Sequence, residues 1–347
     1  MNNNITLKDI AKALNLSVST VSKSLKDSYE IGKSTKQKVL EYARFHHYVP
    51  NRMAKGLKEG KTRSIGVVVC AIDNTFVAQA LEGIYNVGEE KAYQFIIMQS
   101  KESFEQEKNC IELLYSGGID GLLISPSFET VDFSHLNGLQ SSGLPIVLFD
   151  RLSDQIKTHK VAANNFQGAY DATTHLIHSG YRRIAHINTD PNLSIADERL
   201  KGYKKALEDH DIQIVPTLIR ICNYRNNTAL NLDIENAVIE LMSMPSRPDA
   251  IFTATDQIST RTLTLLIKNG YSVPNDVALI GFSNTELADA LNPALSTVHQ
   301  PAYQMGRLAA EKLISLIEAK MPTGHDDYET IILDTEINVR TSSRQQD

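Results

Sequence analysis

Apolar residues near the start of the chain recur at helical spacing in two short stripes that Asn15 separates. The first stripe falls within residues 7–14 and the second within residues 18–25. Ser17 stands where the second helix would begin, and its hydroxyl can accept a hydrogen bond from a backbone N–H that the first turn leaves unpaired. The pattern therefore predicts two helices that meet at a tight turn.

The second predicted helix has a polar outer face. With Val18 and Val21 turned partly inward, short hydrogen-bonding groups and one cation remain outside. These outer residues are Ser19, Thr20, Ser22 and Lys23. A helix with such a face can enter a DNA major groove and contact base edges and phosphates, although an ordinary helical pair in a small core has the same pattern. A third helix over residues 33–46 would complete a three-helix unit.

The segment after this unit has the composition of a short, marginal helix. Pro50 ends any secondary structure that precedes it, and residues 52–58 could form two further helical turns. Gly56 costs such a helix about 1 kcal/mol, and a helix this short is not expected to persist alone in water. We therefore expect it to fold only when two copies meet on DNA, where Leu57 could wedge between base pairs in the minor groove. A flexible linker is the alternative.

From residue 63 onwards, buried strands alternate with helices. Strands are predicted at residues 63–69, 93–98, 121–124, 145–149, 159–162, 184–187, 250–253, 277–280 and 330–339. Helices are predicted at residues 76–92, 105–116, 168–179, 200–209, 233–242, 259–269 and 303–319. Continuous apolar strands joined by helices indicate parallel sheets covered on both faces. Two such sheets would leave a cleft at the carboxyl ends of their strands, which is the default ligand site.

The length of 347 residues suits two or three domains. The chain has no run of about 18 apolar residues, and its first residues lack the features of a secretory signal, so we expect a cytoplasmic protein with no membrane partner. Cys70, Cys110 and Cys222 are far apart and lack CxxC spacing, which indicates reduced thiols rather than disulfides or a zinc site. Phosphate-binding, serine-hydrolase and zinc-protease motifs are absent from the sequence, so neither an enzyme nor a cofactor is expected.

Charge is distributed unevenly along the chain. Residues 1–63 hold 13 Lys and Arg against five Asp and Glu, a balance of +8, whereas the remaining residues hold 22 against 36, a balance of −14. A basic N-terminal segment on an acidic remainder is typical of a protein whose basic segment binds a polyanion such as DNA, while its acidic part does not bind that polyanion.

Sequence motifs follow one another in a fixed order along nearly the whole chain. The first are Thr6-Leu7-Lys8-Asp9-Ile10-Ala11, Leu16-Ser17-Val18-Ser19-Thr20-Val21-Ser22-Lys23, Tyr48-Val49-Pro50-Asn51 and Ser64-Ile65-Gly66-Val67. Later ones are residues 120–122, 149–151, 164–165, 180–185, 199–203, 255–257, 281–282 and 295–298. Together they closely resemble the LacI/GalR family of bacterial transcriptional regulators.

The resemblance implies a small all-α helix-turn-helix head, a hinge helix that DNA orders, and an α/β core of two subdomains like that of periplasmic sugar-binding proteins. The expected domains are the head at 1–49, the hinge helix and linker at 50–63, the core N-subdomain at 64–163 plus 293–323, the core C-subdomain at 164–292 plus 324–341, and a polar tail at 342–347.

The resemblance also places the DNA contacts. The expected set is Thr6, Leu7, Ser17, Val18, Ser19, Thr20, Ser22, Lys23, Asn51, Arg52, Ala54 and Leu57. Val18, Ser19 and Lys23 stand where family members choose bases. The family usually has Arg at the position of Lys23, so a bidentate contact to guanine is not carried over, although Lys can reach the same acceptors with less directional control.

The family places effector contacts on loops from both core subdomains. At the matching positions stand Asp73, Phe76, Asp150, Arg151, Arg199, Thr255, Asp256, Ser283 and Asn284. Carboxylates accept hydrogen bonds from adjacent hydroxyls, guanidinium groups donate in a plane, and Phe76 could stack on the C–H face of a sugar. Phe76 could equally belong to the core, and Asp256 could equally cap the following helix.

Three of these positions depart from the family pattern. Family members commonly have Asp after the Gly-aromatic pair and Asn before the aspartate, whereas this chain has Ser283, Asn284 and Thr255 there. We therefore expect fewer carboxylates beside Arg151 and Arg199, so that the site would tolerate an anionic ligand such as a uronic acid or a sugar phosphate.

The implied function is that of a repressor that binds an inverted-repeat operator as a homodimer. A carbohydrate-type effector would change the angle between the core subdomains and so bias whether the hinge helices pair on DNA. One alternative is a regulator whose main signal is a phosphocarrier protein, and another is a sugar-binding protein without DNA function, against which the basic head argues. The polar tail lacks a leucine heptad, so a dimer is expected rather than a tetramer.

Overall fold

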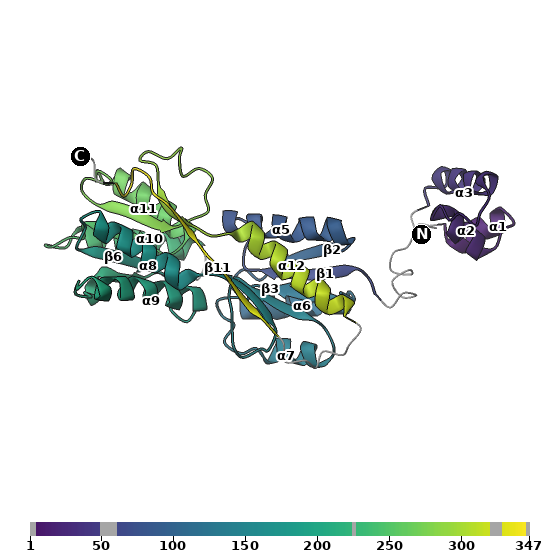
Figure 1. Ribbon diagram of the computed structural model, residues 1–347, viewed down its shortest axis with the longest axis horizontal. Coiled ribbons are helices and arrows are strands. Elements are labelled where there is room, and N and C mark those ends of the chain that lie inside the picture. The colour runs from purple at the N-terminus through teal and green to yellow at the C-terminus, as the bar shows by residue number, and fades with distance from the viewer. Residues whose placement is uncertain (1–4, 49–60, 224–226, 320–327, 345–347) are drawn as a thin grey trace. The chain divides into compact units, whose positions relative to one another are not determined.

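The computed structural model describes residues 5–48, 61–223, 227–319 and 328–344 (Figure 1). The chain divides into two compact units, Met1–Thr62 and Arg63–Asp347. The expected DNA contacts Asn51, Arg52, Ala54 and Leu57 lie outside the described residues. Within the part of the chain that is described, no helix has both the length and the apolar character needed to cross a membrane.

The first unit is helical, as its apolar stripes predict. Within residues 5–48 the helices are α1 (Leu7–Ala13), α2 (Val18–Leu25) and α3 (Lys33–Phe45). Their common core is built from Ile10, Ala11, Val21, Val39 and Ala43. Asn15 has a φ of +52° in the turn between α1 and α2, a left-handed conformation that Asn tolerates better than most residues. The predicted pair of helices with a tight turn is confirmed.

The first sheet of the second unit is parallel throughout its described strands, in the order β11-β5-β4-β3-β1-β2. These strands are β1 (Ser64–Val69), β2 (Gln94–Gln99), β3 (Gly121–Ile124), β4 (Ile146–Phe149), β5 (His159–Ala163) and β11 (Thr330–Leu333). The helices that cover it are α5 (Thr75–Lys91) and α12 (Ala302–Glu318) on one face, and α6 (Phe104–Ser116) and α7 (Ser134–Ser141) on the other.

Alternate residues of β1 explain why both faces are covered. Ile65, Val67 and Val69 pack against α5 and α12, whereas Val68 packs in the cluster formed by α6 and α7. Successive side chains of a strand point to opposite faces, so a strand that is apolar at every position needs a hydrophobic layer on each side.

The second sheet has the strand order β12-β10-β9-β8-β6-β7, and β12 runs antiparallel to β10 at one edge. Its strands are β6 (Ile184–Asn188), β7 (Ile219–Ile221), β8 (Ala250–Thr253), β9 (Ala278–Phe282), β10 (Ser296–His299) and β12 (Glu336–Asn338). Its helices are α8 (Asn165–His178) and α9 (Ser194–Asp209) on one face and α10 (Asn227–Met242) and α11 (Asp256–Lys268) on the other, with the short 3₁₀ helix η1 (Pro216–Leu218) before β7.

The helices of the second half begin earlier than predicted. Helices α8, α9, α10 and α11 were expected from residues 168, 200, 233 and 259, but they start at Asn165, Ser194, Asn227 and Asp256. Their first turns mix polar and apolar residues, so apolar periodicity does not mark where they begin. Two of them begin at a side-chain cap, since Asn164 and Thr255 each accept a hydrogen bond from a backbone N–H of the first turn. The short elements α7, β7 and β10 were not predicted.

The single strand predicted over residues 330–339 is wrong. The segment forms two strands, because β11 joins the first sheet and β12 joins the second. Asp334 and Thr335 carry the chain from one sheet to the other. Both strands keep an extended pattern, so sequence periodicity cannot reveal the crossing between them.

The predicted subdomain boundaries also place two strands in the wrong half. β10 lies within residues 293–323, which were expected in the first half, yet it belongs to the second sheet. β11 lies within residues 324–341, which were expected in the second half, yet it belongs to the first sheet. Periodicity identifies a strand but does not say which sheet it joins, since strand pairing is non-local.

Helices α5 and α12 approach each other closely because both carry glycine at the contact. A Cβ on Gly306 would lie 1.9 Å from the carbonyl oxygen of Ala80, far inside van der Waals contact. This pair of helices covers one face of the first sheet. The carboxyl ends of two strands of that sheet border the cavity described below.

Replacing Gly306 with Ala is expected to lower the free energy of unfolding by about 1–3 kcal/mol, because the added methyl meets backbone rather than a movable side chain. Urea denaturation followed by circular dichroism measures this. Gly138→Ala in α7 is the matched control, since no atom lies within 4 Å of its added Cβ. The control should be neutral or gain up to about 1 kcal/mol, and equal stability of the two variants would contradict the close-contact interpretation.

Candidate functional site

The outer face of α2 is held in place by its own caps. Ser17 accepts a hydrogen bond from the backbone N–H of Thr20 (3.0 Å), which confirms the predicted N-cap. Val21 is fully buried in the head core, whereas the Val18 side chain remains 42% exposed. Ser19 is exposed, and Thr20, Ser22 and Lys23 are partly exposed. The helix therefore presents the predicted polar face, but Val18, which was expected to turn partly inward, is exposed on it.

Two of the expected contacts at α1 have structural roles in the free head. Thr6 forms a capping box with Asp9: the Thr6 hydroxyl accepts from the Asp9 N–H (3.3 Å) and the Asp9 carboxylate accepts from the Thr6 N–H (2.9 Å). Leu7 is partly buried against the head core. Side chains that are already engaged in this way leave less freedom for a specific base contact.

Lys23 has a partner that the sequence did not reveal. Its ammonium forms an ion pair with Glu30, in which both side chains are nearly half exposed. Tyr29, in the same turn between α2 and α3, is 94% exposed and was not among the expected contacts.

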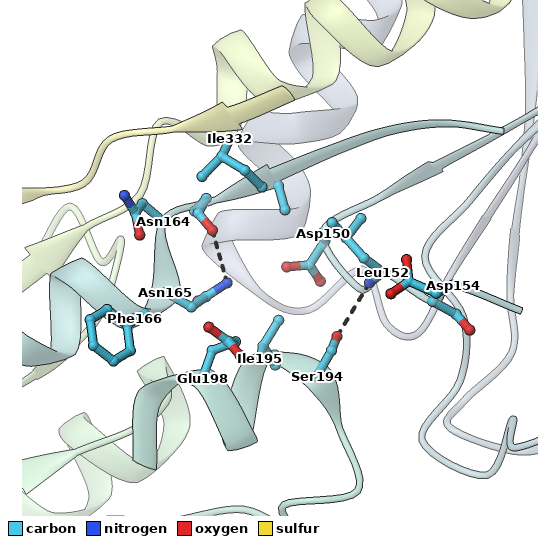
Figure 2. A pocket seen from close by; sticks show the side chains of 13 residues that line it. Asp150, Leu152, Asp154, Asn164, Asn165, Phe166, Ser194, Ile195, Glu198 and Ile332 are labelled. Atoms are coloured by element: carbon cyan, nitrogen blue, oxygen red, sulfur yellow. Dashed lines mark hydrogen bonds between the residues drawn. The ribbon is translucent and has the colours of Figure 1, made fainter. Parts of the chain in front are cut away.

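A cavity of about 360 Å³ lies where the two sheets meet, at the carboxyl ends of β4 and β5 and the first turns of α8 and α9 (Figure 2). Its lining residues are Asp150, Leu152, Ser153, Asp154, Ala162, Ala163, Asn164, Asn165, Phe166, Ser194, Ile195, Glu198 and Ile332. Of the expected effector contacts, only Asp150 belongs to this lining. The charged side chains of the lining are all carboxylates.

Asp150 is the buried acid of the cavity. It has a φ of +65° and is 9% exposed, and Figure 2 shows its carboxylate pointing toward Asn165 and Ile195. The Ser125 hydroxyl donates to its Oδ2 (3.3 Å), and the Arg151 Nε lies 3.9 Å from the same oxygen. Burial raises the pKa of Asp150, against the opposing effect of Arg151 and Arg199.

Arg151 is engaged by an acid that sequence reasoning missed. Its two terminal nitrogens each donate to a different oxygen of Glu102 at 2.6 Å, and one also donates to the carbonyl oxygen of Pro126 (3.0 Å). Although burial opposes it, the Arg151 guanidinium keeps the pKa of Glu102 below its ordinary value. The positive charge of Arg151 is therefore matched inside the protein.

Arg199 is buried without a carboxylate partner among the described ion pairs. Its Nε donates to Asn165 Oδ1 (2.8 Å), one terminal nitrogen to Gln300 Oε1 (2.8 Å) and the other to the Ala254 carbonyl. The guanidinium carbon lies 3.8 Å from the centroid of the Phe282 ring. Burial lowers the pKa of Arg199 to about 9, although Asp150 counteracts it.

A second polar group joins the two halves at the ends of β9 and β10. The Asn284 amide donates to Gln79 Oε1 (2.7 Å), which belongs to α5 in the first half, and to the carbonyl oxygen of Gln300 (2.8 Å). At the cavity itself, the Leu152 N–H donates to the Ser194 hydroxyl (3.3 Å), again across the two halves (Figure 2). Ser194 and Gln79 are thus cross-cleft contacts that the sequence analysis did not identify.

The remaining expected contacts are more local. Thr255, not Asp256, caps α11, because the Thr255 hydroxyl accepts from the Ile258 N–H (3.4 Å). Asp256 instead accepts a hydrogen bond from the Ser283 hydroxyl, and burial raises the pKa of its carboxyl. Phe76 is 7% exposed within the hydrophobic core of the first half, which leaves little of its ring for a ligand. Asp73 is exposed in the loop after β1.

The structure thus brings Asp150, Arg151 and Arg199 into one electrostatic group but adds Glu102, Asn165 and Gln300 to it. A usable signal existed for Glu102 and Asn165, since each closely follows a predicted strand, whereas Gln300 follows β10, which was not predicted. Loops at the carboxyl ends of parallel strands line the cleft of such folds, so every polar residue there was a candidate.

Two protein families match this chain. Residues 6–51 match the family of bacterial regulatory proteins described as the lacI family, and residues 173–343 match the periplasmic binding protein-like domain. The ribose operon repressor of Haemophilus influenzae is 30% identical over 342 residues, which cover 97% of this chain and 98% of that protein.

Solved structures of similar fold span almost the whole chain. A transcriptional regulator CelR in complex with cellobiose is 26% identical, with a TM-score of 0.72, and covers 97% of this chain and 99% of its own. The Lac repressor dimer bound to operator and an anti-inducer is 20% identical, with a TM-score of 0.84, and covers 99% of this chain and 100% of its own. At that identity, the second similarity supports the fold alone.

The environment of Asp150 predicts a pH dependence of stability. The pKa of Asp150 in the folded protein lies above the ordinary value of 3.8, so the folded state binds the proton more tightly than the unfolded state does. The free energy of unfolding therefore falls as the pH rises from about 3.8 through the pKa of the folded state. Asp150→Asn cannot ionise, so we expect its unfolding free energy to increase relative to the natural protein from about pH 4.5 to pH 7. Urea titrations at each pH measure the difference.

Asp154→Asn is the matched control. Hydrogen bonding to Lys160 lowers the pKa of the exposed Asp154 carboxyl, so the linked effect has the opposite sign and is small at this solvated position. Parallel pH profiles for Asp150→Asn and the natural protein would show that Asp150 is not a destabilising buried charge.

Proposed function

Because the chain belongs to the LacI family of bacterial regulatory proteins, we propose that it is a sequence-specific DNA-binding repressor whose operator affinity is set by a small neutral carbohydrate. The cavity between the two sheets would hold the effector, and the head would hold the operator. The single observation that carries the proposal is the pairing of a basic head, with an exposed polar face on α2, and a carboxylate-lined cleft in an α/β core.

We assign operator reading to α2. Val18 and Ser19 offer an apolar and a hydroxyl contact to base edges, and Lys23 offers a cation that reaches acceptors of guanine. Ser17, Thr20 and Ser22 would contact phosphates or pack. The proposed role of Leu57 as a minor-groove wedge, with Asn51, Arg52 and Ala54 beside it, rests on the sequence alone.

The operator is proposed to be an inverted repeat read by a homodimer, since a two-fold axis presents the head twice. Exposed apolar side chains on the edge strand β2 and on the neighbouring helix α5 support self-association of the first half. Ile96 and Ile97 of β2 are each nearly half exposed, and Tyr85 of α5 is 58% exposed. A regulator that binds the chromosome would act in the cytoplasm.

The charge pattern of the cleft favours a neutral effector over an acidic one. The expectation of few carboxylates beside Arg151 overlooked Glu102, which neutralises that arginine, and the cavity itself is lined by Asp150 and Glu198. Carboxylates and amides accept hydrogen bonds from hydroxyl groups, so a polyol matches this lining whereas an anion would meet like charge.

Control of DNA binding is proposed to be a population shift. Hydrogen bonds from Leu152 to Ser194 and from Asn284 to Gln79 cross between the halves on either side of the cleft. A ligand that enters the cleft competes with or reinforces these bonds, so it changes the relative free energies of open and closed cores. The first half, which the hinge segment precedes in the chain, would transmit the change to the head.

The head predicts a test at Lys23. Lys23→Ala should weaken specific binding by about 1–3 kcal/mol and reduce the salt dependence, as loss of a base-contacting cation does. Fluorescence anisotropy on an operator selected from random-sequence duplexes measures both. Glu30→Gln is the matched variant: it removes the ion-pair partner of Lys23, so binding should stay equal or tighten. Unchanged affinity in Lys23→Ala would rule out Lys23 as an operator contact.

The cleft predicts a selectivity for neutral sugars. In thermal-shift assays, a sugar that binds should raise the melting temperature, whereas its acidic counterpart should not, because like charges face it in the cavity. Matched pairs are ribose with ribose 5-phosphate, and glucose with glucuronate. A larger shift with the acidic member of any pair would overturn the neutral-effector proposal while leaving the DNA-binding proposal intact.

A further inference from the structure

Two histidines meet at the outer end of the second half, away from the cleft residues described above. His178 lies in the last turn of α8, and His210 is the C-cap of α9. The Nε2 atoms of the two rings lie 3.4 Å apart, and the ring planes are inclined by 73°. His178 is exposed and His210 is partly exposed, so solvent reaches the pair.

The tautomer of His210 is set by its other ring nitrogen. His210 Nδ1 lies 2.8 Å from the carbonyl oxygen of Ala206, an atom that can only accept, so Nδ1 carries the proton and donates it. The Nε2 atom of the neutral ring then has its lone pair free and aimed toward His178. A histidine that binds a metal ion commonly donates its second ring N–H to a backbone carbonyl in this way.

The distance between the two nitrogens matches a pair of metal ligands. A transition-metal ion binds imidazole nitrogen at about 2.0–2.1 Å, so two ligands on adjacent corners of a tetrahedron lie roughly 3.4 Å apart. The same distance is long for a direct N–H···N hydrogen bond, whose usual range ends at about 3.2 Å. The separation of the two nitrogens therefore suits two ligands of one ion, as well as a long hydrogen bond between the rings.

Local electrostatics favour a cation at this position. α8 and α9 run in the same direction, since Gly202 of α9 lies beside Phe166 near the start of α8 and His210 lies beside His178 at its end. Both helix C-termini, each equivalent to roughly half a negative charge, thus lie at the pair. The Asp209 carboxylate beside His210 is paired with Lys205 (2.6 Å), and Arg344, which lines a surface hollow with His178, opposes a cation, so the two helix ends supply the favourable charge.

We propose that His178 and His210 form a surface site for one divalent transition-metal ion of the kind that prefers imidazole, such as Zn²⁺, Ni²⁺ or Cu²⁺. No group of three or more His, Cys, Asp or Glu in the described residues completes the coordination, so water fills the other positions. The Asp209 carboxylate is held by Lys205 (2.6 Å) and by the Tyr170 hydroxyl (3.3 Å), which keeps it out of the ligand set.

The bound ion would tie the C-terminal ends of α8 and α9 together. Because the unfolded chain separates the two histidines, binding to the folded state raises stability in proportion to the occupancy of the site. The proposal concerns a surface remote from the effector cavity, whose lining contains neither histidine. It stands or falls independently of the proposed regulatory function.

Isothermal titration of the full chain with ZnCl₂ and NiCl₂ tests the site, with MgCl₂ as the negative ion. We expect one equivalent to bind, and His210→Gln and His178→Gln each to weaken that equivalent about tenfold or more. The melting temperature should rise with Zn²⁺ and return after EDTA is added. A nitrogen hyperfine pattern from two imidazoles in the Cu²⁺ spectrum should shrink to that of one in each variant.

Two further variants keep the result interpretable. His46→Gln removes an exposed histidine of the head and should leave the titration unchanged. The variants should melt at the temperature of the natural protein without metal, which excludes a folding defect. Equal binding by the natural protein and the His178→Gln/His210→Gln double variant would overturn the proposal, as would loss of the bound equivalent in His46→Gln alone.

Discussion

The buried guanidinium of Arg199 is the constraint on which the second half of the cleft depends. A charge with 3% exposure and no carboxylate among its described partners requires every one of its donors to be satisfied, because an unsatisfied buried charge is strongly destabilising. Its partners come from three separate places: the start of α8, the end of β8 and the end of β10. Phe282 supplies the fourth contact, a ring face against the cation. One side chain of α9 thereby fixes the positions of α8 and of the ends of β8 and β10 relative to one another.

Local patterns in the sequence were sufficient for the elements but not for their partners. Ser17 as the cap of α2 follows from a side chain acting on the backbone three residues away, and the alternating burial of β1 follows from its unbroken apolar run. Local patterns could not pair Glu102 with Arg151, because the two residues are 49 positions apart in the sequence. Only the folded sheet brings the carboxyl ends of β2 and β4 to the same side. The separation of β11 from β12 was missed for a similar reason, since pairing partners rather than periodicity distinguish the two strands.

The ion pair between Glu102 and Arg151 changes which ligand charge the cleft is expected to favour. Ser283 and Asn284, where family members commonly have Asp, predicted room for an anionic ligand, whereas the structure supplies an acid for Arg151 and leaves Asp150 buried beside it. Ionising a carboxyl in such surroundings costs free energy, because burial disfavours its charged form. A ligand hydroxyl that donates to Asp150 would relieve part of that cost, so the proposed polyol effector would bind where the protein carries an unfavourable buried charge.

The passage of the chain between the two sheets has a mechanical consequence. The chain crosses from one half to the other after β5, after β10 and after β11, so three separate links of fixed length join the halves. Sliding or wholesale separation would stretch at least one of them, whereas a small rotation about an axis through the links leaves all three nearly unstrained. A protease that cut one link would therefore leave the halves joined by the other two. The geometry of the links favours a hinge rotation of the two halves over independent motion of two flexibly linked domains.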